Sequence, residues 1–223
     1  MFGGRGDRLR RRLTGPDFVT HHGSRSRLAP LLGRAMLADM HDVKDLMPRY
    51  RAPIRRVVTN KSGRVGYRTL SANEMPNASG RTAACHIFNE FQRQFSEVRE
   101  TITQLCHALD RKPDGCIGSL QTGGGVISRH CDDVGVIAVQ IFGTRQWRIE
   151  PNSDPPAGIH DPVYVPAKLR DGWSAEFGPA SHTVTLMPGS VLYVPVGWWH
   201  ETRSSEDSFA LAISLRETPQ SRR

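Results

Sequence analysis

The chain has 223 residues, enough to bury one full hydrophobic core, so we expect a single folded unit. Hydrophobic residues make up 38% and charged residues 23%, proportions that exclude an intrinsically disordered chain. The formal net charge of +8 comes partly from arginines near both ends, so it gives little reason to expect nucleic-acid binding. We expect a basic, flexible tail over residues 1–15 and a second flexible tail over residues 217–223.

The cysteines indicate a reducing compartment. They show neither a CxxC pair nor the spacing of a disulfide framework; they are Cys85, Cys106, Cys116 and Cys131. No apolar signal segment follows the first arginines, and no run of about 18 apolar residues predicts a membrane span. We therefore expect a cytoplasmic protein that does not contact a membrane.

Residues 16–112 are predicted to form helices and an edge hairpin that pack on a barrel. Apolar residues recur at roughly helical spacing from residue 28 to residue 46, which predicts one or two short helices interrupted by Pro30 and Gly33. Residues 50–82 contain two strand-like segments, so we expect a hairpin that borders a pocket. A longer helix is predicted over residues 87–109, where apolar residues keep a spacing of three to four.

Residues 113–216 are predicted to form an antiparallel β-barrel, because short apolar runs alternate with Gly, Pro, Asp and Ser. The predicted strands are Cys116–Gln121, Val134–Ile141, Gln146–Glu150, Ser181–Leu186, Val191–Val194 and Phe209–Leu215. In the last strand Ala210, Ala212 and Ser214 alternate with large residues, so we expect the small set to leave room inside the barrel. The proline-rich residues 151–180 are predicted to be a lid or a substrate loop.

Three side chains in the barrel region have the residue types of a metal site. His130 and Asp132 are two residues apart, so on an extended strand both leave the same face and can converge on one ion. His200 follows a turn at Gly197 that presents a third ligand. Two imidazoles and one carboxylate form a facial triad, which leaves coordination positions open for a cosubstrate and dioxygen.

Arg145 adds a requirement for an anion. Together with Trp147 and Ile149 it projects to one face of its predicted strand. When that face is the barrel interior, Arg145 is a buried cation that needs an anionic partner. A dicarboxylate cosubstrate supplies one through two parallel charge-assisted hydrogen bonds.

The order of these motifs resembles the Jumonji C (JmjC), or cupin-8, family of Fe(II)- and 2-oxoglutarate-dependent oxygenases. The resemblance rests on Gly123-Gly124-Gly125-Val126, His130-x-Asp132, Gln140, Gly143-x-Arg145-x-Trp147 and Pro188-Gly189-x-x-x-Tyr193-x-Pro195-x-Gly197-Trp198-Trp199-His200-Glu201. Within this family, the arrangement of the motifs is most similar to that of the bacterial ribosomal-protein hydroxylases. The chain ends before the C-terminal dimerisation and winged-helix regions of those hydroxylases, so the ribosomal substrate is not carried over.

The resemblance implies a mainly β fold with N-terminal helices, built as a double-stranded β-helix (a cupin or jelly-roll barrel). It makes His130, Asp132 and His200 the Fe(II) ligands and makes Arg145 the residue that binds the far carboxylate of 2-oxoglutarate. We also expect cofactor contacts from Gln121 or Thr122 and from Ser214. The implied reaction consumes O2 and 2-oxoglutarate and hydroxylates an unactivated C–H bond, in a peptide or protein side chain or in a free amino acid or natural product.

Two other functions remain open from the sequence. The first is a cupin metalloenzyme that does not use 2-oxoglutarate, against which Arg145 argues. The second is a non-catalytic binding barrel, against which the complete triad argues. Several other side chains have simpler interpretations as turn, core or surface residues; these are Trp198 and Trp199, Tyr193, and His21, His22, His160 and His182.

Overall fold

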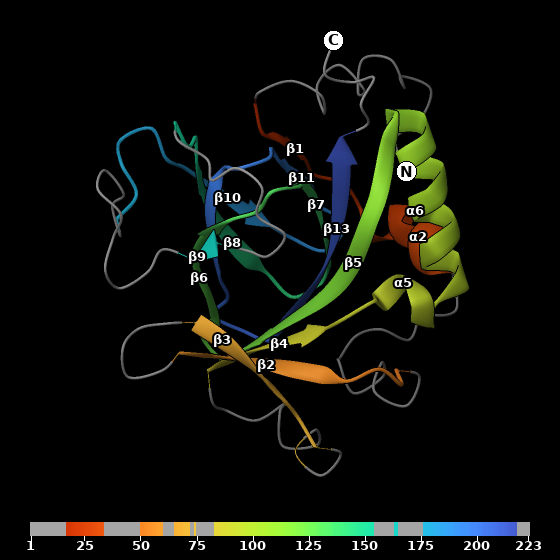
Figure 1. Cartoon of the computed structure of the whole chain (residues 1–223), viewed down its shortest axis with the longest axis horizontal. Coiled ribbons are helices and arrows are strands. Elements are labelled where there is room, and N and C mark those ends of the chain that lie inside the picture. The colour runs from red at the N-terminus through yellow and green to blue at the C-terminus, as the bar shows by residue number, and fades with distance from the viewer. Residues whose placement is uncertain are drawn as a thin grey trace.

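The computed structural model describes residues 17–33, 50–59, 65–71, 74, 83–153, 163–164 and 176–217. In this part of the chain two antiparallel sheets face each other, and short helices pack beside β5 of the larger sheet (Figure 1). This is the mainly β barrel with N-terminal helices that the sequence predicted. None of the described helices is long and apolar enough to cross a membrane.

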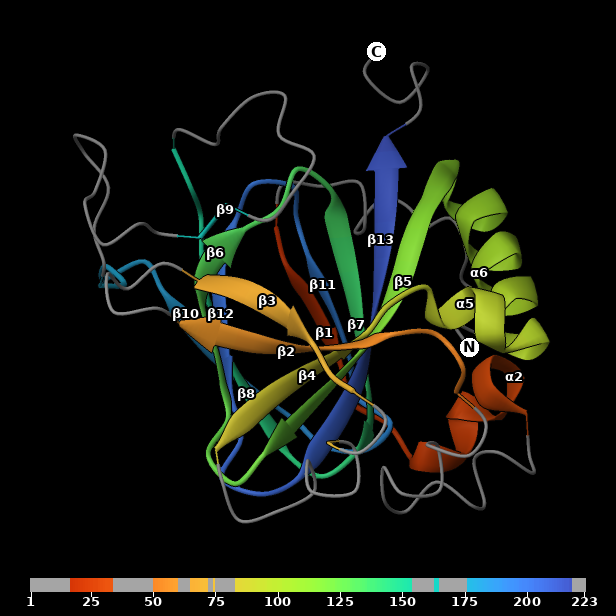
Figure 2. The ribbon, with the colours of Figure 1, turned by 60° about the horizontal axis from the view of Figure 1, so that its bottom comes forward.

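The larger sheet has eight strands. In sheet order they are β1 (Val19–His21), β11 (Val191–Val194), β7 (Gly135–Phe142), β13 (Ser208–Glu217), β5 (Arg111–Thr122), β4 (Ala84–Phe88), β2 (Ile54–Thr59) and β3 (Val65–Thr69). β2 and β3 form the predicted hairpin at one edge and lie across one end of the barrel (Figure 2). β4 pairs with β5, so strands from before and after residue 113 share one sheet.

The smaller sheet has five strands and carries the candidate metal ligands. In sheet order they are β10 (His182–Leu186), β8 (Arg145–Glu150), β12 (Trp199–Arg203), β6 (Val126–Cys131) and β9 (Val163–Tyr164). The six strands predicted from the sequence are all present in the two sheets, some of them longer than predicted. Most of the predicted loop over residues 151–180 lies outside the described residues.

The predicted helix over residues 87–109 is partly wrong, because its first turn is the end of β4. The rest is divided into α5 (Phe91–Gln94) and α6 (Ser96–Leu109). Glu90 has a left-handed backbone with φ 51°, and Phe95 is extended with φ −132° and ψ 114°, so the helix is interrupted twice. β4, α5 and α6 all bury apolar residues in one core. Their combined apolar positions therefore resemble the spacing of a single helix, although the helix is not continuous.

The first predicted helical segment is confirmed where it is described, except that Pro30 lies in the first turn of a helix and does not interrupt it. A 3-10 helix, η1 (Arg25–Leu28), continues into α2 (Ala29–Leu32), and Gly33 follows as the C-cap with φ 73°. Residues 34–49 lie outside the described part of the chain. α2 packs against α6, so the N-terminal helices form one layer beside the larger sheet.

Phe209 lies at the centre of the core between the helices and the larger sheet. Its ring is fully buried and lies 5.6 Å from Phe88, 5.8 Å from Phe91 and 5.8 Å from Phe142, measured between ring centroids. A second apolar cluster, which includes Trp147, fills part of the space between the two sheets. The remaining interior space is available for a site.

Replacing Phe209 with alanine is expected to lower the free energy of unfolding by about 3–5 kcal/mol, because the fully buried ring leaves a cavity among other rings. Urea denaturation measures the change. The matched control is Val58→Ala on the exposed edge hairpin, for which we expect a change below about 0.5 kcal/mol. Equal effects of the two variants would contradict this description of the core.

Candidate metal centre and its cavity

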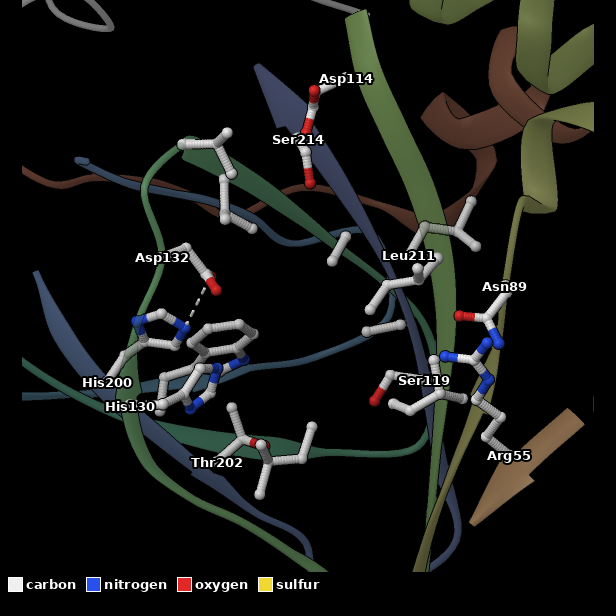
Figure 3. A pocket seen from close by; sticks show the side chains of 18 of the residues that line it. Arg55, Asn89, Asp114, Ser119, His130, Asp132, His200, Thr202, Leu211 and Ser214 are labelled. Atoms are coloured by element: carbon white, nitrogen blue, oxygen red, sulfur yellow. Dashed lines mark ion pairs between the residues drawn. The ribbon is translucent and has the colours of Figure 1, made fainter. Parts of the chain in front are cut away.

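The predicted triad comes together at the pairing of β6 with β12. His130 and His200 are direct cross-strand partners, and Asp132 follows the end of β6. One ligand atom from each of the three residues lies within 4.8 Å of the others. The backbone N–H of Gly197 donates to the carbonyl of Asp132 at 2.8 Å, so the turn before β12 also fixes the position of Asp132. Figure 3 shows the three side chains directed toward one point.

Both histidines are held in the tautomer that a metal ligand needs. Nδ1 of His130 lies 2.8 Å from the carbonyl oxygen of Ser128, and Nδ1 of His200 lies 3.0 Å from that of Trp198. A carbonyl oxygen accepts and cannot donate, so the proton is on Nδ1 and the lone pair of Nε2 faces the cavity. Nε2 of His200 lies 3.4 Å from Oδ2 of Asp132. This donor set fits Fe(II), for which two imidazoles and one carboxylate are typical ligands.

The protonation states also suit a metal ion. Burial, and after it the neighbouring His200, lower the pKa of His130 to about 4, so His130 is neutral at pH 7. Burial acts to raise the pKa of Asp132, but the close approach of His200, and after it that of His130, outweighs burial and lowers the pKa. Neutral imidazole and carboxylate are the forms that bind a metal without first losing a proton.

A cavity of about 270 Å³ opens between the two sheets in front of the triad. Its walls include His130, Asp132, His200 and Arg145. The ring of Trp147 stacks on His200 with centroids 5.8 Å apart, and its buried Nε1 has no hydrogen-bond partner among the described residues. A buried donor without an acceptor is costly, so a polar group bound in the cavity fits this wall.

Arg145 is buried, with 1% of its surface exposed. Its guanidinium donates to the hydroxyls of Ser119 (2.9 Å) and Ser208 (3.1 Å) and to the carbonyls of the same two residues. Within the described part of the chain no carboxylate pairs with it. Burial lowers the pKa of Arg145 to about 10, and Cys85 nearby offsets this only in part. The arrangement is that of a preformed binding group for an anion.

The other predicted cofactor residues lie at different depths. Ser214 lines the cavity, as do Ala210 and Ala212 of the same strand. Gln121 is fully buried below it, where its amide donates to the carbonyl (3.1 Å) and hydroxyl (2.6 Å) of Thr202. Thr122 is buried as well and is not among the lining residues. The cofactor roles of Ser214, Gln121 and Thr122 stay predictions.

Ser119, Ser208 and Thr202 were missed by the sequence analysis. Ser119 precedes Gln121 by two residues on β5 and so shares its face, and Thr202 follows His200 by two residues on β12. The period of two would have found both once the strand faces were assigned. Ser208 had no such signal, because it lies before the predicted start of the last strand.

The side chains that were interpreted as core, turn or surface residues lie away from the triad wherever they are described. Tyr193 is buried in the main core. Trp199 is buried, and Trp198 packs near Phe18 with ring centroids 6.1 Å apart. His21, His22 and His182 are exposed and outside the cavity, and His160 lies outside the described residues.

A buried ion pair supports the triad from the outer face of the smaller sheet. Arg129 and Glu150 are 2.8 Å apart, with 8% and 12% of their side chains exposed. The Arg129 guanidinium also lies 4.6 Å from the Phe177 ring and 5.0 Å from the Trp199 ring, and Glu150 accepts from the backbone N–H of Gly178 at 2.8 Å. Arg129 and Trp199 are sequence neighbours of the two histidines, so this contact braces both ligand strands.

Comparison with known proteins identifies the family. The JmjC domain matches residues 92–222, more than half of the chain. The chain belongs to the JmjC family. This confirms the resemblance predicted from the sequence. Among solved JmjC-like structures, the ribosomal oxygenase YcfD of Escherichia coli, in complex with cobalt and 2-oxoglutarate, superposes with a TM-score of 0.63 at 17% identity. The match covers 96% of this chain and 52% of YcfD, and it shows that the two share the jelly-roll fold.

Curated relatives of this JmjC chain are longer than it is. YxbC of Bacillus subtilis (strain 168) is 32% identical over 133 residues, which are 53% of this chain and 40% of YxbC. The bifunctional lysine-specific demethylase and histidyl-hydroxylase NO66 of Drosophila pseudoobscura pseudoobscura is 32% identical over 92 residues, 39% of this chain and 8% of NO66. The matched segments cover less than half the length of each relative.

Replacing Asp132 with alanine is expected to weaken metal binding by more than about 100-fold, because loss of a carboxylate ligand exceeds the 10–100-fold cost of losing a ligand's supporting partner. Isothermal titration with Co(II) measures the affinity. The control is Asp133→Ala, which removes the adjacent carboxylate from its contact with Arg216 and is expected to change the affinity less than about twofold. A triad that binds Co(II) equally well without Asp132 would refute the assignment.

Replacing Glu150 with alanine is expected to cost about 3–5 kcal/mol of unfolding free energy, because it removes the carboxylate partner of a buried guanidinium. The control is Glu201→Ala on the same outer face. Glu201 lies 3.6 Å from Arg203, which is largely exposed, so we expect a cost below about 1 kcal/mol. Guanidinium denaturation compares the two variants, and a cost for Glu150→Ala no greater than for Glu201→Ala would contradict the bracing role.

Proposed function

We propose that the chain is an Fe(II)- and 2-oxoglutarate-dependent oxygenase that hydroxylates an unactivated C–H bond. One observation carries the proposal. A single cavity holds the His130, Asp132 and His200 triad together with Arg145, a buried cation that has no carboxylate partner in the part of the chain that is described. Membership of the JmjC family supports the same chemistry. The complex of YcfD with cobalt and 2-oxoglutarate is a precedent for both ligands on this fold.

Each group in the cavity has a proposed task. His130, Asp132 and His200 would hold the iron through Nε2, a carboxylate oxygen and Nε2. Arg145 binds the far carboxylate of 2-oxoglutarate, with Ser119 and Ser208 fixing its orientation. When bound, iron and 2-oxoglutarate supply the oxidation, in which one oxygen atom of O2 enters succinate, the other enters the substrate, and CO2 leaves.

The protein contributes geometry and exclusion of water rather than acid-base groups. The apolar cluster that contains Trp147 closes the interior between the sheets, and the small residues Ala210 and Ala212 leave space in front of the iron. Inside such a cavity the carboxylate of the cosubstrate competes with no solvent for the guanidinium of Arg145. The site therefore favours binding of an anionic cosubstrate over binding of a neutral one.

The proposed substrate class is an amino-acid side chain, in a peptide or protein or in a free amino acid. NO66 is named a lysine-specific demethylase and histidyl-hydroxylase, and YcfD is described as a ribosomal oxygenase, so protein side chains are substrates with precedent in this family.

Arg145→Gln is expected to weaken 2-oxoglutarate binding about 100-fold and leave Fe(II) binding within about threefold, because it removes the buried positive charge that attracts the far carboxylate and leaves the metal ligands in place. An anaerobic titration of the Fe(II) protein with 2-oxoglutarate, followed by the visible charge-transfer band, measures both affinities. The control is Arg148→Gln on the opposite face of β8, where the side chain contacts Ser181. A wild-type protein that gives no band would overturn the proposed function, and equal loss of both affinities would show that Arg145 is misplaced.

A further inference from the structure

The wall of the cavity that faces the triad carries a second arginine. Arg55 of β2 and Asn89, which follows β4, both line the cavity, as does Tyr67 of β3. Figure 3 shows the Arg55 side chain beside that of Asn89, on the opposite side of the cavity from His130 and His200. Arg55 makes no ion pair with any residue of the described part. β2 and the end of β4 thus place a guanidinium and an amide together on the side of the cavity opposite the two histidines.

The charges at the metal end of the cavity balance without Arg55. Asp132 contributes −1, Fe(II) +2, 2-oxoglutarate −2 and Arg145 +1, which sum to zero. Arg145 therefore has an anionic partner once the cosubstrate is bound. Arg55 is more exposed than Arg145, and none of the described carboxylates pairs with it. A guanidinium and a neighbouring amide both donate hydrogen bonds, and carboxylates are the common partners of such donors.

The carboxylates of the cavity wall do not neutralise Arg55. Asp114 and Asp133 both contact Arg216, which lies 3.2 Å from Asp133 and bridges the two. Figure 3 shows Asp114 next to Ser214, away from Arg55 and Asn89. The two sides of the cavity therefore differ in sign. An anionic group of a substrate is attracted toward Arg55 and repelled from Asp114 and Asp133.

We propose that Arg55 and Asn89 form a subsite that binds a carboxylate of the substrate and so holds the reacting C–H bond toward the iron. This rests on the proposed function and narrows its substrate class to molecules with a carboxylate near the hydroxylated carbon. The carboxylate belongs either to a free amino acid or to an acidic side chain of a peptide. Substrates whose reacting part is cationic are disfavoured, because their charge would face Arg55.

A panel of compounds tests the subsite with the Fe(II) and 2-oxoglutarate complex of the full chain. It contains the free L-amino acids, their C-terminal amides, and end-blocked peptides with Asp or Glu in one set and Lys or Arg in the other. Binding is read anaerobically from the change in the charge-transfer band, and turnover from succinate formation. The strongest responses are expected from carboxylates, and amidation of the responding carboxylate should weaken binding at least about tenfold. Free amino acids and acidic peptides distinguish the two sources.

Variants assign the response to residues. Arg55→Gln is expected to weaken the best responder at least about tenfold, and Asn89→Leu about threefold, while 2-oxoglutarate affinity stays within about twofold. Arg56→Gln is the matched control, because Arg56 is the next residue on β2, carries the same charge and does not line the cavity. It should leave all affinities unchanged.

The outcomes separate the subsite from the proposed function. With the band present, the subsite is overturned when the strongest responder lacks a carboxylate, when no carboxylate responds, or when Arg55→Gln binds the best responder as tightly as Arg56→Gln does. Absence of the band in the wild type overturns the proposed function and the subsite together.

Discussion

The pairing of β6 with β12 is the constraint on which the site depends. It places His130 directly opposite His200, and the alternation of side chains along both strands then sends Arg129 and Trp199 to the outer face. The inner face carries the metal ligands, and the outer face is stabilised by the Arg129–Glu150 ion pair and by the Phe177 and Trp199 rings. A slip of one residue would exchange these two faces, so metal binding and packing require the same register.

The sequence predicted the parts of the site that follow from the period of a strand. His130 and Asp132 are two residues apart, and Arg145, Trp147 and Ile149 alternate along one strand, so the shared face of each set needed no long-range information. The broken helix over residues 87–109 was not predictable in the same way. A strand end, a short helix and a long helix each present apolar residues to one core, and only the backbone angles of Glu90 and Phe95 separate them.

Contacts between distant segments were beyond the sequence analysis. The alternation of β5 and β12 contains Ser119 and Thr202, but nothing in it says that a serine of β5 holds the guanidinium of Arg145 from β8. Likewise, the strand-like residues near Arg55 predicted a hairpin by a pocket, without indicating which side chain enters it. Pairing partners such as β4 with β5 are set by tertiary packing, and local patterns do not encode them.

The pairing of β4 with β5 also determines how far this barrel can be truncated. Residues 92–222 match the family, yet the wall that holds Arg55 and Asn89 comes from chain that precedes them. A fragment that starts at residue 92 would leave one edge of β5 with unpaired amide and carbonyl groups, which is a template for pairing with another chain. The smallest fragment that keeps β5 paired on both edges therefore begins before residue 92, and a fragment cut at the family boundary would expose a strand edge that favours aggregation.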